Sequence, residues 1–455
     1  MNKLRVGIYT LGCKVNQQES EMISRQFALL GFELAAPGER ADAYIINSCT
    51  VTAAADSKSR QRIRQAKALN PDALVAVIGC YPQAAREEVA RMEEVDLVLG
   101  SADKEGVADQ VGKLLRRARN DKRDCAQNEG GELVSAESGG ANEAGGSPRE
   151  RTRAWLKACD GCDRFCSYCV IPSARGAVRS AAPAQIAREA RGLIAAGYKE
   201  IVVTGINLAL YGTDLKGARA LSAAGAGKPA DGIFALLSRL CSLDGEYRIR
   251  LGSLEPTVID ASAAARIAGL SRVCPHFHLS LQSGSDRVLQ KMKRRYTAEG
   301  YAEILAALRG LDPHFAVTTD VIAGFPGETD EDFSDSLSFV RAAGFAKVHV
   351  FRYSKRKGTA AADMPGHLPN AVKAERAAAL AKAAEEGAAA FREGCNGTLR
   401  RTLLFGPDKG GRFVRGITDN GIDVRVPAGA FENPAAAENT FCDLELTREI
   451  IGGFS

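Results

Sequence analysis

The sequence predicts an α/β protein with an N-terminal parallel-sheet domain, a central partial (β/α)6 barrel and a C-terminal small β-barrel. Three observations lead to this prediction. Strand and helix patterns alternate over the first ~115 residues and again over residues 151–392. Residues 395–455 then show strand patterns alone. The chain of 455 residues is long enough for about three such domains.

Residues 1–119 form the first predicted domain. The expected strands cover 4–12, 43–48, 73–79 and 96–100, and the expected helices cover 17–30, 53–68 and 84–93. Because parallel strands end at a common edge, Cys13, Cys49 and Cys80, which each follow a predicted strand, should converge there. The alternative is three unrelated buried thiols, since cysteine is often a small core residue.

Residues 120–150 are rich in Gly, Ser, Glu and Asn and predict a flexible linker, in which we assign no role to Cys125. Beyond this linker, residues 151–392 contain six strand–helix units. The expected strands lie near 154–158, 200–205, 247–254, 276–282, 316–322 and 347–353, and the closing helix at 370–392. Six units fall short of the eight that close a full barrel, so we expect a partial, open barrel.

Residues 395–455 alternate apolar and polar residues between glycine-bearing turns, which is typical of a small β-barrel. The whole chain carries a net charge of +5, which alone does not indicate a nucleic acid partner. Basic residues nevertheless cluster within 58–67, 291–295 and 352–357, and three such runs favour phosphate contact modestly over solvated faces.

Cysteine usage and hydropathy indicate the compartment. Twelve cysteines in a chain of this length favour metal chemistry in a reducing environment over a disulfide framework. The sequence shows no evident secretory signal and no apolar run long enough for a membrane span. We therefore expect a cytoplasmic protein without membrane contact.

The most informative motif is CxxxCxxC, formed by Cys162, Cys166 and Cys169 in the loop after the first barrel strand. Three thiolates at this spacing can hold three irons of a 4Fe-4S cube and leave the fourth iron open to a small ligand. Cys159 forms a CxxC pair with Cys162, so a four-thiolate zinc or electron-transfer site is the alternative. We favour the open-site cluster, with Cys159 as the tail of the preceding strand.

Several longer motifs identify a family. They are CDRFCSYCVIPSARG, TLGCKVNQQES, NSCTVT, RIRLGSLEP, HLSLQSGSD, TDVIAGFPGET and FRYSKRKGT. Over nearly its whole length the chain resembles the methylthiotransferase family of radical SAM enzymes, and most of all the branch that acts on threonylcarbamoyladenosine in tRNA. The resemblance implies an enzyme that inserts sulfur and adds a methyl group at carbon 2 of that adenosine, next to the anticodon.

The same resemblance implies the cofactors. Two 4Fe-4S clusters are expected, one on the CxxxCxxC cysteines and an auxiliary one on Cys13, Cys49 and Cys80. S-adenosylmethionine (SAM) would both donate the methyl group and generate the 5′-deoxyadenosyl radical. The other implied partners are tRNA, an electron donor such as flavodoxin or ferredoxin, and a sulfur donor, with the enzyme acting as a monomer.

Candidate SAM contacts lie near the barrel rim, where the strands are expected to end. They are Thr204, Gly205, Ser253, Glu255, Gln282, Ser283 and Asp320, with a GFPGE turn at 324–328 as the adenine loop. For Glu255 or Asp320 the alternative is a rim salt bridge with Arg248, Arg250 or Arg175. On a strand, His278 is expected to be a hydrogen-bonded core histidine.

The C-terminal domain resembles the RNA-binding TRAM domain, with Arg412, Phe413 and Arg415 as candidate RNA contacts. Within the family, the rival functions are methylthiolation of isopentenyladenosine in tRNA or of an aspartate in a ribosomal protein. The rival from another class is a non-catalytic iron-sulfur electron carrier with an RNA-binding tail. Three cysteines that leave one iron open argue against that carrier.

Overall fold

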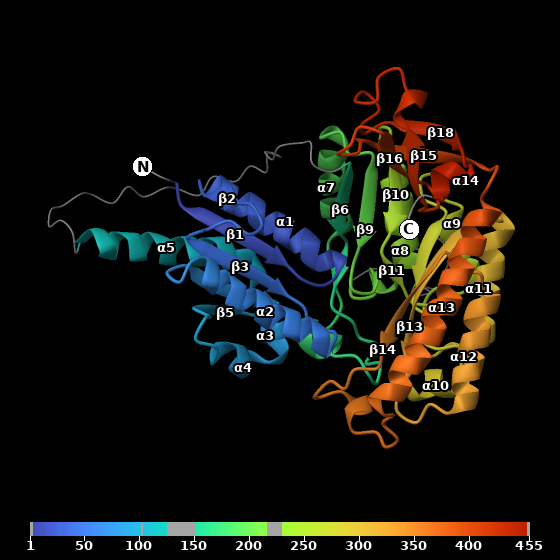
Figure 1. Cartoon of the computed structure of the whole chain (residues 1–455), viewed down its shortest axis with the longest axis horizontal. Helices are drawn as coiled ribbons and strands as arrows, with labels where there is room; N and C mark the ends of the chain where they lie inside the picture. Colours follow the sequence, from blue (N-terminus) through green and yellow to red (C-terminus); the bar gives the residue numbers. More distant parts are fainter. Residues whose placement is uncertain (1–2, 102, 125–151, 216–229, 453–455) are drawn as a thin grey trace. The chain divides into compact units, whose positions relative to one another are not determined.

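A computed structural model describes residues 3–101, 103–124, 152–215 and 230–452 (Figure 1). The chain divides into two compact units, Met1–Ser147 with Val170–Gly176, and Pro148–Cys169 with Ala177–Ser455. Most of the predicted linker, including Cys125, lies outside the described residues. The helix before it ends at Asp124, beyond the domain boundary expected at residue 119.

The first unit contains a five-stranded parallel sheet in the order β2-β1-β3-β4-β5. The strands are β1 (Arg5–Thr10), β2 (Glu33–Ala35), β3 (Ala43–Ser48), β4 (Leu74–Gly79) and β5 (Leu97–Leu99). The four predicted strands are confirmed. The edge strand β2 was not predicted, because three residues are too few to show a period of two.

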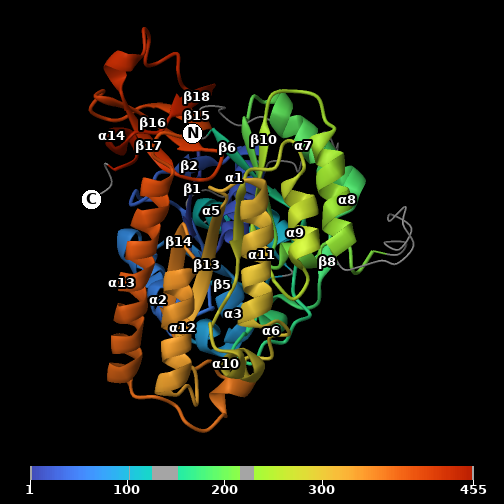
Figure 2. The ribbon, with the colours of Figure 1, turned by 90° about the vertical axis from the view of Figure 1, so that its right-hand side faces the viewer.

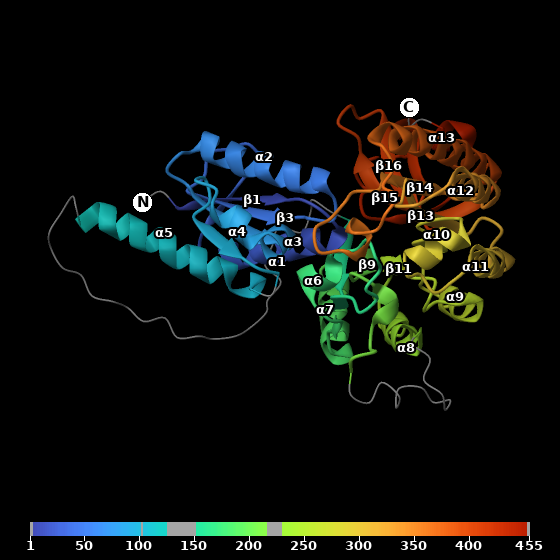
Figure 3. The ribbon, with the colours of Figure 1, turned by 90° about the horizontal axis from the view of Figure 1, so that it is seen from below.

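Helices cover both faces of this sheet. They are α1 (Lys14–Leu29), α2 (Ala53–Leu69), α3 (Cys80–Ala84), α4 (Arg86–Ala90) and α5 (Val107–Asp124), with α6 (Ile171–Arg175) also in this unit. Apolar residues of α1 and α5 pack on one face, and those of α2 and α4 on the other (Figure 3). The sheet is therefore the middle layer of three, and its strand ends stay free to carry loops.

The second unit contains the six predicted barrel strands, all parallel. They are β6 (Arg153–Lys157), β9 (Glu200–Thr204), β10 (Arg248–Leu251) with β11 (Ser253–Leu254), β12 (His276–Leu279), β13 (Ala316–Ala323) and β14 (Lys347–Arg352). β10 and β11 are halves of one predicted strand, interrupted at Gly252. An additional antiparallel pair, β7 (Cys159–Asp160) and β8 (Arg179–Ser180), was not predicted.

The barrel helices form an arc on the outer side of the strands (Figures 2 and 3). They are α7 (Pro183–Ala195), α8 (Ala230–Cys241), α9 (Ala261–Ala268), α10 (Asp286–Lys291), α11 (Ala298–Leu311), α12 (Asp330–Ala342) and α13 (Asn370–Gly394). This arrangement confirms the partial (β/α)6 barrel. Among the helices that the structure describes, none combines the length and the apolar character that a membrane crossing requires.

The C-terminal domain belongs to the second unit and forms a four-stranded antiparallel sheet in the order β17-β16-β15-β18. The strands are β15 (Leu399–Pro407), β16 (Phe413–Thr418), β17 (Asp423–Pro427) and β18 (Phe441–Glu445), followed by α14 (Arg448–Ile451). The predicted β-strands after residue 395 are confirmed, whereas the short helix α14 was not predicted.

A buried ionic network joins this sheet to the barrel. The carboxylate of Glu200 accepts hydrogen bonds from Arg153 (2.6 Å), Arg248 (2.7 Å) and Arg250 (2.9 Å). Arg248 also donates to the carbonyl of Ile417, and Arg250 to a neighbouring carbonyl of β16. Burial raises the pKa of Glu200, but the three guanidinium groups outweigh it and hold that pKa well below its usual range.

We expect Glu200→Gln to lower the free energy of unfolding by about 3–5 kcal/mol, because it leaves Arg248 and Arg250 buried without their anion. Urea unfolding followed by circular dichroism would measure the loss. Glu246→Gln is the matched control, since Glu246 is exposed and pairs with Lys199 at the surface. Glu246→Gln should lower the free energy of unfolding by less than about 1 kcal/mol. Equal losses for the two variants would contradict this interpretation of the network.

Candidate functional site

The three motif cysteines of the second unit lie on one loop after β7, and each is half-buried. The backbone N–H of Cys169 donates to the carbonyl of Cys166 (3.0 Å), which closes a turn between them. Ser167 attaches this loop to the end of α10, since its hydroxyl donates to the carbonyl of Lys291 (2.8 Å). The structure therefore holds the three thiols on one anchored loop, as the spacing predicts.

Glu255, which follows β11, is buried and holds the same loop from the barrel side. One carboxylate oxygen pairs with Arg164 of the cysteine motif (3.0 Å) and accepts from Asn207 (2.7 Å). The other accepts from Arg294 (2.8 Å), which also donates to the hydroxyl of Tyr168 (3.0 Å). These bonds make Glu255 a positioning residue for the cysteine loop.

The alternative weighed for Glu255, a rim salt bridge with Arg248, Arg250 or Arg175, names none of its observed partners. Arg248 and Arg250 bind Glu200, and Arg175 binds Glu19 in the first unit. The observed partner is an arginine inside the CxxxCxxC motif, together with Arg294 from one of the basic runs. Sequence reasoning missed them because a loop arginine has no periodic signal that assigns it a partner.

Cys159 packs in the barrel core, whereas Cys162, Cys166 and Cys169 are half-buried on the loop that follows it. Its side chain is buried, and a Cβ on Gly205 would come within 2.5 Å of its sulfur. Burial raises the pKa of this thiol to about 12. This environment favours three-thiolate ligation and disfavours the four-thiolate alternative.

Cys162 and Cys166 have surroundings that suit anionic sulfur better. Burial raises the pKa of both thiols. Against this, the backbone N–H of Arg164 lowers the pKa of Cys162, and the Arg294 guanidinium lowers the pKa of Cys166. Half-buried thiols on one loop, beside a cation and a backbone donor, fit a three-thiolate 4Fe-4S cluster.

The candidate SAM residues occupy the C-terminal ends of consecutive strands, as predicted. Thr204 ends β9, and Ser253 lies in β11. Gln282 follows β12 with φ of +68°, an uncommon conformation for a residue with a side chain, and such conformations concentrate at functional sites. The hydroxyl of Ser283 instead contacts Ser336 of α12 (3.1 Å).

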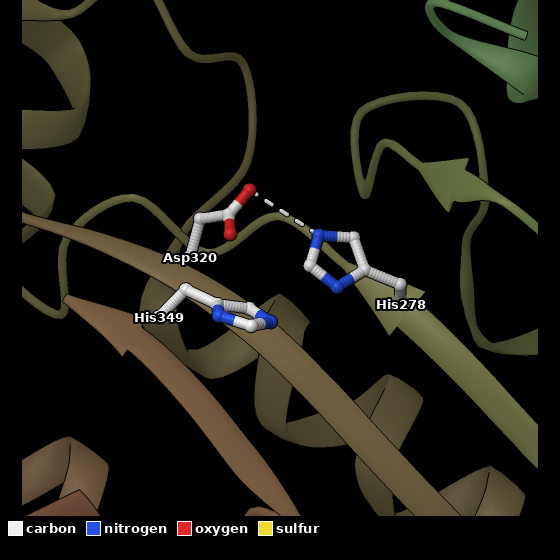
Figure 4. Close-up of side chains that lie close together, drawn as sticks. All are labelled: His278, Asp320 and His349. Atoms are coloured by element: carbon white, nitrogen blue, oxygen red, sulfur yellow. Dashed lines mark hydrogen bonds and ion pairs between the residues drawn. The ribbon is translucent and has the colours of Figure 1, made fainter. Parts of the chain in front are cut away.

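The GFPGE segment forms the predicted turn between β13 and α12. Glu328 is buried and accepts from the backbone N–H of Gly324 (3.0 Å) and from Arg376 of α13 (2.6 Å). The turn is therefore held from two sides. Asp320, the remaining candidate, accepts a hydrogen bond from His278 (3.2 Å) and lies next to His349 (Figure 4).

In the first unit, Cys49 and Cys80 come directly after β3 and β4, and Cys13 comes three residues after the end of β1, at the same edge of the parallel sheet. Gly12 precedes Cys13 with φ of +107°, and its Cβ, if present, would lie 2.7 Å from that of Cys49. Burial, together with the nearby Cys80 and Cys13, raises the pKa of Cys49 to about 11. The three thiols therefore converge as expected.

Arg175 is a residue of this cysteine group that sequence reasoning missed. It lies in the segment 170–176, which follows the CxxxCxxC motif in sequence but belongs to the first unit. Its buried guanidinium donates to the sulfur of Cys80 (3.2 Å), to Glu19 (3.0 Å) and to Asn16 (2.5 Å). Glu19 is also paired with the buried Lys104. Two cations and one carboxylate leave excess positive charge next to the thiols, which suits thiolate ligands.

The candidate RNA contacts lie on β16 and just before it. Arg412 and Arg415 are exposed, Phe413 is half-buried, and the Arg412 guanidinium lies 6.0 Å from the centre of the Phe413 ring. Arg415 pairs across strands with Arg425 of β17, which adds a third exposed arginine to this face. By contrast, the basic run in α2 is largely neutralised, for example in the Lys67–Asp96 ion pair (3.0 Å).

Comparisons with known proteins agree with this fold and site. The radical SAM superfamily model matches residues 156–340, and the model of uncharacterized protein family UPF0004 matches residues 5–100. The solved radical S-adenosylmethionine methyltransferase TsrM from Kitasatospora setae superposes with a TM-score of 0.54 at 13% identity, over 98% of this chain and 86% of that chain. At that identity the likeness shows the fold alone. Fold, motif and model match together define a radical SAM enzyme.

Relatives with higher identity define the family. The threonylcarbamoyladenosine tRNA methylthiotransferase of Bacillus subtilis is 40% identical over 82% of this chain and 78% of its own length. That of Thermotoga maritima is 36% identical over 88% and 86%. A tRNA-2-methylthio-N(6)-dimethylallyladenosine synthase of Pelotomaculum thermopropionicum is 34% identical over 91% and 90%. The chain belongs to the methylthiotransferase family of radical SAM enzymes, which implies a 4Fe-4S cluster and SAM.

Proposed function

We propose that this enzyme methylthiolates carbon 2 of threonylcarbamoyladenosine next to the anticodon of tRNA. The observation that supports methylthiolation is the presence of two separate cysteine triplets, one in each unit, which would hold one cluster each. Relatives named for this substrate reach 40% identity, which supports it over the dimethylallyladenosine branch.

We assign the radical SAM cluster to Cys162, Cys166 and Cys169, and an auxiliary 4Fe-4S cluster to Cys13, Cys49 and Cys80. When bound, a cluster with an open iron supplies the electron that cleaves SAM. The protein's part is to hold the ligands: Glu255 fixes the first loop through Arg164 and Arg294. In the second triplet, Arg175 supports Cys80.

SAM binding is assigned to the strand ends that surround the cysteine loop. The proposed contacts are Thr204, Gly205, Ser253, Gln282 and Ser283, with Glu255 acting through the loop. Asp320 was also predicted as a SAM contact, and its neighbours His278 and His349 suggest a second role for it. Flavodoxin or ferredoxin as electron donor, a sulfur donor and a monomeric state remain predictions.

The substrate is tested by reacting the anaerobically reconstituted enzyme with two tRNAs, one carrying threonylcarbamoyladenosine and one carrying isopentenyladenosine. Nucleoside mass spectrometry should detect a methylthio product from the first and none from the second. Product from isopentenyladenosine alone would assign the enzyme to the rival branch.

The proposed RNA-binding face leads to a separate prediction. Joint replacement of Arg412, Phe413 and Arg415 by alanine should weaken tRNA binding at least tenfold, because it removes two phosphate-binding charges and a stacking surface. The slope of log affinity against log salt concentration should fall by about 2. Fluorescence anisotropy with labelled tRNA would measure both quantities, and SAM binding should not change.

Point variants are preferable here to deletion of residues 395–455, since Arg248 and Arg250 donate to carbonyls of the C-terminal sheet. Deletion would leave these buried donors unpaired. Arg448→Ala is the matched control, because Arg448 is an exposed arginine of the same domain that pairs with Glu393. If the triple variant binds tRNA as well as this control does, recognition lies in the rest of the chain.

A further inference from the structure

Two histidines and an aspartate converge on the wall formed by the last three barrel strands. His278 lies on β12, Asp320 on β13 and His349 on β14 (Figure 4). One ring nitrogen of each histidine and a carboxylate oxygen of Asp320 all lie within 4.8 Å of one another. The register explains this convergence, because Asp320 and His349 are direct neighbours across the β13–β14 pair.

His278 is oriented in the way that metal-binding histidines are. Its Nδ1 lies 3.0 Å from the hydroxyl of Thr318, while its Nε2 faces the carboxylate of Asp320 at 3.2 Å. A hydrogen bond at one ring nitrogen fixes the ring and leaves the other nitrogen to bind a cation. The side chains of His278 and Asp320 are 13% and 26% exposed, and His349 is an exposed residue, so the site is reachable from solvent.

His349 adds a third candidate ligand beside the hydrogen-bonded His278–Asp320 pair. The His349 ring centre lies 6.1 Å from that of His278, and the two ring planes are tilted by 50°. Two ligands bonded to one ion at about 2.0–2.2 Å lie about 3–3.5 Å apart, a spacing that His278 and Asp320 already have at 3.2 Å. Two imidazoles and one carboxylate form a ligand set that suits zinc or ferrous iron.

We propose that His278, Asp320 and His349 bind one divalent transition-metal ion through two imidazole nitrogens and one carboxylate oxygen. Three protein ligands leave further coordination positions for water or for an oxygen-bearing ligand. This site uses none of the six cluster cysteines. It is also independent of the proposed tRNA substrate, since metal binding is measured without SAM and without tRNA.

The test is a titration of the reconstituted, oxidised enzyme with Mn²⁺, followed by the electron paramagnetic resonance signal of the free ion. Mn²⁺ is the probe because it prefers oxygen and nitrogen ligands to thiolates, so the cluster cysteines compete weakly for it. We expect one Mn²⁺ per chain, displaced by Zn²⁺. Asp320→Asn and His349→Ala should each weaken binding at least tenfold, whereas His367→Ala, a replacement of an exposed histidine outside this group, should not.

The iron content of each variant shows whether it has folded. If His349→Ala has lost its iron, His349→Gln is tested in its place. The proposal is overturned if the wild-type enzyme binds no Mn²⁺ at millimolar concentration. It is equally overturned if Asp320→Asn and the His349 variant bind Mn²⁺ as the wild type does. An Asp320→Asn variant that binds SAM more weakly but Mn²⁺ unchanged would assign Asp320 to the cofactor, as the sequence predicted.

Discussion

Replacing Cys162, Cys166 and Cys169 by alanine should abolish SAM cleavage. It should also lower the iron content by about half, from about eight atoms per chain to about four. The loss of SAM cleavage is expected to be complete because, under the proposed assignment, these three thiolates hold the cluster whose open iron cleaves SAM. The remaining iron should stay because the other triplet lies in the other unit. Iron analysis and chromatography of 5′-deoxyadenosine after anaerobic reconstitution would measure both quantities.

Cys159→Ala is the matched control for this triple variant, since Cys159 belongs to the same CxxC pair but packs in the barrel core. It should keep its iron and its SAM cleavage. A triple variant with unchanged iron would refute the cluster assignment. A Cys159→Ala variant that loses half of its iron would instead restore the four-thiolate alternative.

Replacing Cys13, Cys49 and Cys80 by alanine should eliminate the methylthiolated product while 5′-deoxyadenosine still forms. The physical reason is that these cysteines belong to the first unit, so the SAM-cleaving loop with its Glu255 anchor stays intact in the second. Mass spectrometry of the tRNA nucleosides and of the small-molecule products in one reaction would separate the two activities.

Cys274→Ala is the control for this second variant, because Cys274 is a buried cysteine far from either triplet in sequence. It should form product at the wild-type rate. If the triple variant of the first unit also forms methylthiolated adenosine at that rate, its three cysteines are structural and the auxiliary cluster is not needed.

The sequence predicted most strands of the N-terminal sheet and all six barrel strands, because buried parallel strands are short apolar runs between helices and this pattern is visible without tertiary information. For the same reason it placed Cys13, Cys49 and Cys80 together at one edge of the first sheet. The short elements were missed: β2 has three residues, and β7 and β8 have two each. Such strands depend on their neighbours more than on their own residues.

The partners of charged residues could not be predicted in the same way. Arg175 bonds to Cys80 and Glu19, which are 95 and 156 positions away in sequence. Glu255 binds Arg164, whose direction is set by the path of an irregular loop. Neither contact can be recognised from a periodic pattern in the sequence. The left-handed backbone at Gln282 is also invisible in the sequence, because nothing about glutamine predicts it.

The central claim is that this enzyme adds a methylthio group to threonylcarbamoyladenosine in tRNA. The most direct measurement is mass spectrometry of total tRNA nucleosides from a strain that lacks this chain, compared with the same strain carrying it on a plasmid. We predict that 2-methylthio-threonylcarbamoyladenosine disappears in the first strain, that its unthiolated precursor accumulates, and that the plasmid reverses both changes. An unchanged level of this nucleoside, with loss of a methylthio group from isopentenyladenosine or from a ribosomal protein, would contradict the claim.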